Sequence, residues 1–274
     1  VYNVALSNAS SVATTFAFSL GGGSASASEF TNAPTFSNGV SLAGGIITVP
    51  AGVTSFSVSV PTIDDALVES GPNETLPLTI GGVTGNGAII DNESAQTVTS
   101  VSADTQVEGT SLVHTVTLSG ASAVATTHSF SLSGVSATAG ADFSTTAVFS
   151  DGVTLAAGVL TVPAGVTSFT VSVPTLQDTI DESAETTSIV VGGVSASGTI
   201  NDDDDKPFVT SVSADTQVEG TSLVHTVTLS NASSSSTTYT LSLADVIATG
   251  GGTDYTSTLT SAAFSNGVTL AAGI

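Results

Sequence analysis

Clustered carboxylates are the side chains of this sequence that could do chemistry. Residues 202–205 are four successive aspartates, and Lys206, which follows them, is the only lysine or arginine in the 274-residue chain. Adjacent carboxylates repel one another by roughly 3 kcal/mol for each close pair when the effective dielectric constant is about 20. This run is therefore unsuited to packing and needs either full solvation or a cation.

The carboxylates in the middle of the chain fall at the ends of expected strands. Glu108 precedes the second strand of this region, residues 178–185 precede the sixth, and residues 202–204 follow the last. In a β-sandwich such strand ends meet at one tip, and hard oxygen ligands that meet there describe a Ca²⁺ site. The alternative is a solvated acidic tip or an adaptation to salt. Clustering favours the metal, because a solubilising charge would be spread over the many Ser and Thr positions.

The histidines and serines do not predict catalysis. When the repeated parts of the sequence are aligned, His114 falls opposite Tyr2 and His128 opposite Phe16, so these positions are filled by rings of different chemistry. We expect them to pack rather than to act as bases or metal ligands. No serine has a constant histidine beside it, so no nucleophilic triad can be proposed and we expect no enzyme.

Composition excludes several partners. The net charge of −22, with one Lys and no Arg, removes the electrostatic basis for binding nucleic acid or an anionic membrane surface. No apolar run approaches the ~20 residues that a membrane-spanning helix needs, so we expect no membrane insertion. The absence of Cys excludes disulfide frameworks and thiolate metal sites and leaves a cation held by oxygen atoms.

An internal repeat divides the chain. Residues 209–230 are identical to residues 98–119, and Val1 aligns with Val113. A period near 111 residues is typical of tandem domains of ordinary size. We expect a truncated repeat without its first strand, a complete repeat, and a truncated repeat without its second half, at residues 1–96, 97–206 and 207–274.

Alternation of apolar and small polar residues predicts about seven strands in the complete repeat, and no segment has a helical period of useful length. The expected strands are residues 98–103, 112–118, 126–132, 159–162, 168–173, 186–191 and 195–200. Asn38-Gly39 and Asp151-Gly152 predict two-residue hairpins with positive φ at both turn positions. Together these signals predict an all-β fold of tandem antiparallel β-sandwiches with an extra hairpin.

Several motifs resemble the Calx-beta domain family. They are Val107-Glu108-Gly109, Asp142-Phe143, the Asp-x-x-x-Glu of residues 178–182 with a further Glu at 185, and the closing Ile-Asn-Asp-Asp-Asp of residues 200–204. The resemblance covers the whole middle copy. It implies a seven-stranded, immunoglobulin-like sandwich that binds Ca²⁺ at one tip.

This resemblance also implies a ligand set. In the middle copy the ligands would be Glu108, Asp142, Asp178, Glu182, Asp202, Asp203 and Asp204, and in the first copy Asp65, Glu69 and Asp91. The sequence departs from the family pattern at Gln177, where the family has the first of two paired aspartates. The first copy has Glu29 at the position of Asp142.

Near-identical repeats without a catalytic centre suit a spacer, whose length comes from copy number. The Ser/Thr/Ala-rich tandem copies resemble the stalks of large bacterial surface adhesins secreted by type I systems. We therefore expect a Ca²⁺-binding extender of a cell-surface or biofilm adhesin, extracellular, whose partners are neighbouring repeats of the same long chain and, as an option, other copies of itself. The alternative is a module that binds a ligand such as carbohydrate. A lectin-like site should show clustered exposed aromatic rings, and this chain has no Trp and three Tyr.

Overall fold

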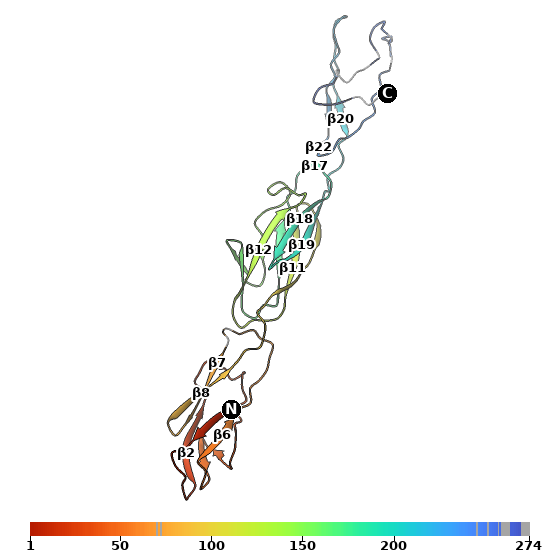
Figure 1. Ribbon diagram of the computed structural model, residues 1–274. Coiled ribbons are helices and arrows are strands. Elements are labelled where there is room, and N and C mark those ends of the chain that lie inside the picture. Colours follow the sequence, from red (N-terminus) through yellow and green to blue (C-terminus); the bar gives the residue numbers. More distant parts are fainter. Residues whose placement is uncertain are drawn as a thin grey trace.

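The computed structural model describes residues 1–69, 71, 73–244, 246–250, 252–256, 258 and 264–269. These residues form β-strands without helices, grouped into β-rich units that follow one another along a long axis (Figure 1). In this described part of the chain no helix is long and apolar enough to cross a membrane.

The first unit holds strands β1 to β8 in two sheets. The sheet orders are β1-β6-β3 and β4-β5-β2-β7-β8. The strands are β1 Tyr2–Ala5, β2 Thr14–Leu20, β3 Thr35–Phe36, β4 Ser41–Ala43, β5 Ile46–Val49, β6 Ser55–Ser59, β7 Glu74–Ile80 and β8 Val83–Ile89.

The middle unit holds strands β9 to β19, and all of them except β17 lie in two sheets. Their orders are β13-β16-β11-β9 and β10-β19-β18-β12-β15-β14. The strands are β9 Val98–Val101, β10 Asp104–Val107, β11 Ser111–Leu118, β12 Thr126–Gly134, β13 Val148–Phe149, β14 Thr154–Ala156, β15 Val159–Val162, β16 Ser168–Pro174, β17 Ile180–Asp181, β18 Glu185–Val191 and β19 Val194–Asn201. All seven expected strands are present, with ends that differ by a few residues.

The described residues of the third unit hold three short strands, β20 Val209–Val212, β21 Val227–Leu229 and β22 Ala232–Ser233. Strand β20 pairs with β21, whereas β22 pairs with β17 of the middle unit. The chain is thus all-β, and its first and middle units are tandem immunoglobulin-like β-sandwiches.

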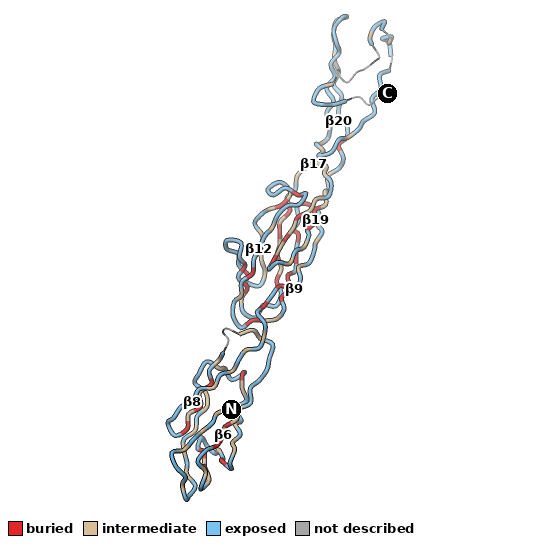
Figure 2. The backbone as a smooth tube through the Cα atoms, viewed as in Figure 1, coloured by how far each residue is buried: buried red, intermediate tan, exposed pale blue. Residues whose placement is uncertain are grey.

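Apolar side chains on alternate strand positions fill the space between the two sheets. In β11 the inward residues Leu112 and Val116 are fully buried, and Phe130 of one sheet meets Phe149 of the other edge to face, with ring centroids 5.4 Å apart. Phe18 and Phe36 repeat this contact in the first unit at 5.8 Å. Figure 2 shows the buried residues along these strands. Burial of this alternating apolar face is what selects strands over other local structure.

The expected hairpin at Asp151-Gly152 is wrong, although its turn geometry is as expected. Both residues have positive φ, 54° and 73°. The flanking strands do not pair with each other, because β13 pairs with β16 and β14 pairs with β15 in the opposite sheet. The turn therefore carries the chain from one sheet to the other. The actual extra hairpin is β14–β15, which turns at Ala157 and Gly158 with φ of 49° and 77°.

Within the middle unit one strand pair departs from the expected antiparallel arrangement. Strand β10, which the alternation did not predict, runs parallel to β19, with Asp104 opposite Gly198 and Val107 opposite Asn201. It is the edge strand of its sheet. This pair matters for the site, because both strands end at the same tip.

The histidine predicted to pack is buried. His114 has no exposed surface, and its Nδ1 donates to the backbone oxygen of Ser102 at 2.7 Å. Its ring lies near Gly198, where an added Cβ would stand 3.4 Å from Nε2 and 2.5 Å from Thr187 Oγ1. The ring thus fills space above a glycine, as the alignment with Tyr2 predicted.

Replacement of Gly198 by alanine should destabilise the middle unit. The new methyl group would stand 2.5 Å from Leu112 Cδ1, and overpacking of this kind costs about 1–3 kcal/mol. Gly85→Ala is the matched control in the first unit, because its Cβ would meet only Tyr2 Cδ1 at 3.9 Å. Thermal unfolding of the full chain should show a lower transition for Gly198→Ala alone. Equal behaviour of the two variants would contradict the packing described.

Candidate metal centre

The parallel pairing of β10 with β19 positions the first acidic residues. Both strands end at the same tip, and the amide of Glu108 donates to the backbone oxygen of Asn201 at 3.0 Å. Residues 202–204 continue from Asn201, so the Glu108 side chain lies beside them. Glu108 is only 8% exposed. A glutamate, which is rarely buried without a partner, therefore faces a run of aspartates.

A buried aromatic ring fixes the next acidic residue. Phe143 has no exposed surface and forms a β-bridge with Thr175. The neighbouring backbone oxygen of Asp142 accepts a hydrogen bond from the amide of Leu176 at 2.9 Å. The loop that carries Asp142 is thereby attached to the loop that carries Asp178, although the two are far apart in the sequence.

The loop of residues 178–182, which we call the acidic loop, has the same shape in both units. Asp178 Oδ1 accepts from the amide of Ile180 at 2.7 Å, and Asp65 Oδ1 accepts from the amide of Leu67 at 2.7 Å. These Asx turns fix the backbone at the start of the Asp-x-x-x-Glu motif. In the first unit the acidic loop is residues 65–69.

The carboxylates of the middle unit gather in two groups. Glu108, Asp178 and Asp204 each offer an oxygen within 4.8 Å of the others. Asp142, Glu182 and Glu185 do the same, also within 4.8 Å. The acidic loop supplies one residue to each group, so the two groups adjoin.

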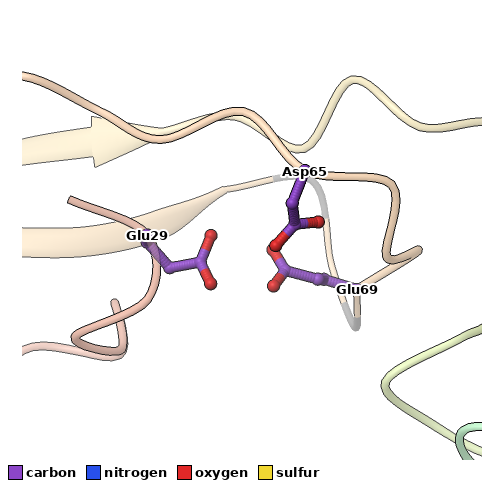
Figure 3. Close-up of side chains that lie close together, drawn as sticks. All are labelled: Glu29, Asp65 and Glu69. Atoms are coloured by element: carbon purple, nitrogen blue, oxygen red, sulfur yellow. The ribbon is translucent and has the colours of Figure 1, made fainter.

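The first unit brings together one group of three. Glu29, from the loop after β2, faces Asp65 and Glu69 of the acidic loop (Figure 3), and their oxygens lie within 4.8 Å of one another. Glu29 is 7% exposed. Its Oε1 accepts hydrogen bonds from the Ser26 and Ser28 hydroxyls, each at 3.1 Å, which hold it in place.

Three residues of the expected ligand set lie beside these groups rather than in them. Asp203 is exposed, and its Oδ1 accepts from Gln177 Nε2 at 2.8 Å. Asp91 Oδ2 accepts from the amide of Glu69 at 3.2 Å. Asp202 is half-buried, and its Oδ1 is enclosed without a hydrogen-bond partner in the protein.

Two residues of the groups were not in the expected ligand set. Glu185 was part of the sequence motif and Glu29 was recognised as the counterpart of Asp142, but neither was assigned as a ligand. Both can be found from the alignment of the two copies, because Glu74 matches Glu185 and Glu29 stands at a position that is otherwise Asp.

Burial among like charges raises the pKa of several of these carboxyls. Burial, followed by the charges of neighbouring aspartates, raises the pKa of Glu108 to about 7. Burial and then a hydrogen bond with Asp142 raise the pKa of Glu185 to about 7, and burial and then the charge of Glu29 raise that of Glu69 to about 7. Near neutral pH these groups therefore exchange protons easily.

The donor set fits a hard divalent cation. Every donor is a carboxylate oxygen, Lys206 is exposed, and there is no Arg to neutralise the groups. Asp202 Oδ1 and Asp204 Oδ2 are buried without hydrogen-bond partners in the protein. Ca²⁺ takes about six to eight oxygens at about 2.3–2.6 Å, so two oxygens on opposite sides of one ion lie up to about 5 Å apart. The spacing within each group is compatible with this requirement.

Without divalent cations the folded chain should lose stability as the pH rises from about 5 to about 8. Glu69, Glu108 and Glu185 have a pKa of about 7 in the folded chain, against an ordinary value of 4.5. The folded state therefore binds protons more tightly, and the resulting stability is present below the ordinary value and is lost as the pH rises through about 7. His128 opposes this trend, since burial lowers its pKa.

Thermal melts in chelator across this pH range measure the effect. The chain with all three glutamates replaced by Gln should lose less stability over this range. Four other carboxyls with a raised pKa remain in it, Glu74, Glu93, Glu182 and Asp204, while His128 opposes them. An unmodified chain whose melting temperature rises from pH 5 to pH 8 would contradict the assignment.

No family model and no curated protein sequence matches this chain. Similar solved structures include the crystal structure of CBD12 from CALX1.2, with TM-score 0.26, 15% identity and coverage of 68% of this chain and 71% of that chain. The calcium-binding domain CBD12 of CALX1.1 has a TM-score of 0.26 and 16% identity, over 69% of this chain and 71% of that chain. The I9-I11 tandem from titin has a TM-score of 0.21 and 8% identity, over 72% of this chain and 62% of that chain. At these scores the similarities do not identify a family, and the fold rests on the strand pairing described above.

Proposed function

We propose that this chain is a Ca²⁺-binding extender segment of a bacterial cell-surface or biofilm adhesin, which gives reach and stiffness to the protein that contains it. The observation that carries the proposal is the placement of the carboxylate groups. In each of the first two units the acidic loop lies at the end that faces the next unit: Val68 contacts Ser122, and Asp181 contacts Ser233.

The residues that would hold the cation come from segments that are far apart in the sequence. In the middle unit they are Glu108, Asp142, Asp178, Glu182, Glu185 and Asp204, with Asp202 and Asp203 beside them. In the first unit they are Glu29, Asp65 and Glu69, with Asp91 beside them. Bound Ca²⁺ would supply the positive charge that these groups lack. The carboxylates would then hold three loops and the start of the following linker in one arrangement.

A role outside the cell and at a surface is supported by the sequence. Units of near-identical sequence set a length by their number, and an acidic chain without Cys suits a Ca²⁺-rich exterior where stability comes from packing and a hard cation. The resemblance to repetitive adhesin stalks supports the more specific assignment. The carboxylate groups at the ends that face the next unit support a spacer role.

Ca²⁺ should raise the melting temperature of the full chain. Extracellular Ca²⁺ modules have dissociation constants of about 10⁻⁴ to 10⁻³ M, and a hundredfold excess over such a constant adds about 2.7 kcal/mol to the stability of a state that alone binds the ion. Glu182→Gln should reduce this gain strongly. Asp151→Asn removes the same charge at the distant sheet-crossing turn, where Asn38 stands in the first unit, and should leave the gain unchanged.

Melts with Ca²⁺ and with chelator, supported by calorimetric titration, make this measurement. Equal melting temperatures in the two buffers would end the proposal that Ca²⁺ binds. An equal loss of the gain in both variants would show that the acidic loop is not the binding site.

Chelation should also change the shape distribution of the chain in solution. With Ca²⁺ bound, the carboxylates at the end of each unit are fixed next to the linker, whereas without it they repel one another and release the linker. Small-angle scattering should give a long and narrowly defined maximum dimension in Ca²⁺ and a broader distribution in chelator. Identical distributions would leave the ion with a role inside each unit only.

A further inference from the structure

The two junctions between units repeat one contact in detail. At the first junction the amide of Ala123 donates to the backbone oxygen of Val68 at 2.7 Å. At the second junction the amide of Ser234 donates to the backbone oxygen of Asp181 at 3.0 Å. Each contact is accompanied by a parallel β-bridge, between Val68 and Ser122 and between Asp181 and Ser233. The bridge at the second junction is the β17–β22 pair that joins the units in Figure 1.

A serine hydroxyl strengthens both contacts. Ser122 Oγ donates to the backbone oxygen of Val68 at 3.1 Å. Ser233 Oγ lies 3.2 Å from the backbone oxygen of Asp181 and 2.7 Å from its Oδ2. Ser122 is 2% exposed. The fourth residue of the acidic loop thus binds a short turn of the next unit, residues 121–123 or 232–234, which we call the docking turn.

The docking turn has the same internal structure where no acidic loop contacts it. In the first unit it is residues 9–11, where Ser10 Oγ accepts from the amide of Val12 at 3.2 Å and the Ser10 backbone oxygen accepts from Gly52 at 2.8 Å. In the middle unit Ser122 makes the equivalent bonds with Val124 at 3.3 Å and Gly165 at 2.8 Å. The turn is therefore preorganised by its own unit, and docking adds only the bonds to the acidic loop.

The linkers are held against the same end of the following unit. Gln96, 8% exposed, donates from Nε2 to the backbone oxygens of Gly120 and Val166 at 2.7 and 3.1 Å. Its counterpart Pro207 is buried, and Tyr239 donates to its backbone oxygen at 2.7 Å. The covalent connection and the docking contact therefore attach at two separate points, which is what fixes a rotation between two bodies.

We propose that the docking turn is a recognition surface for the acidic loop of another unit of this kind, and that this contact sets the rotation of each unit relative to the one before it. The partner is recognised mainly through its backbone, because Val68 and Asp181 differ in charge and shape yet their backbone oxygens accept the same amide bond from the docking turn. The proposal deepens the extender function and rests on it, because a fixed rotation between units is useful only in a chain that acts as a spacer. The contact itself uses no residue that we assign as a metal ligand.

The test compares Ser122→Ala with Ser10→Ala in the full chain. Both variants lose the internal bond of the turn, but only Ser122→Ala loses a bond to an acidic loop. The reporter is the amide of Val68, which donates to the backbone oxygen of Ala121 at 3.2 Å. Loss of one hydrogen bond of ordinary strength should speed the hydrogen exchange of this amide about fivefold in Ser122→Ala. In Ser10→Ala its exchange should match that of the unmodified chain.

Ser233→Ala provides a second measurement at the other junction, read at the amide of Ser234, so that the outcome does not depend on one variant. Exchange at the junction amides that is unchanged in both junction variants, or that rises equally in Ser10→Ala, would overturn the docking proposal. Repeating the set in Ca²⁺ and in chelator separates the two proposals. If Ca²⁺ has no effect on stability but exchange at the junction changes as expected, the metal function is contradicted and the docking proposal stands. If Ca²⁺ stabilises the chain but exchange at the junction does not change, only the docking proposal is contradicted.

Discussion

Repulsion between buried like charges is the constraint on which the rest of this structure depends. Glu108 and Glu29 are almost fully buried and face further carboxylates, and the sequence offers one Lys and no Arg to compensate them. Interactions without net charge hold carboxylates of this site in place. The backbone pairing of β10 with β19 positions Glu108, and the buried ring of Phe143 positions its neighbour Asp142. The hydrophobic core thus stabilises an arrangement that electrostatics opposes. The opposition can be relieved by protons, which the raised pKa values reflect, or by a cation.

Because these carboxylates lie next to the junction between units, neutralising their charge would also affect the junction. The two ends of the acidic loop, Asp178 and Glu182, belong to the carboxylate groups, while the residue before Glu182 is bonded to the next unit. A change in the conformation of the acidic loop therefore alters the position of the adjacent residue that bonds to the next unit. Since the linker after Asp204 is short and Pro207 is buried in the following unit, there is little chain in which such a change could be absorbed.

The sequence predicted the strands well and the site in part. Alternating burial identified the seven main strands because each has one face in the core. It missed β10, whose edge position leaves Asp104 and Gln106 as its inward residues, and it misjudged the turn at Asp151, because local φ preferences do not determine which sheet a following strand joins. Most expected ligands meet at one tip. Glu29 was not assigned, although the alignment places it opposite Asp142, because the sequence alone does not show that its carboxylate lies with those of Asp65 and Glu69.

Repetition also shows which properties of this chain are not local. Leu223 and Val227 lie in a segment identical to that of Leu112 and Val116, yet they are 56% and 54% exposed whereas the latter are fully buried. The difference in exposure follows from the neighbouring strands. Strand β11 pairs with β16, and the described residues of the third unit include no strand equivalent to β16. The junctions behave in the opposite way. The bonds that both junctions share involve the backbone of the acidic loop, so the backbone contact is the same at Val68 and at Asp181, although the Asp181 carboxylate also bonds to Ser233. An array can therefore vary the charge at each joint while keeping one geometry along its length.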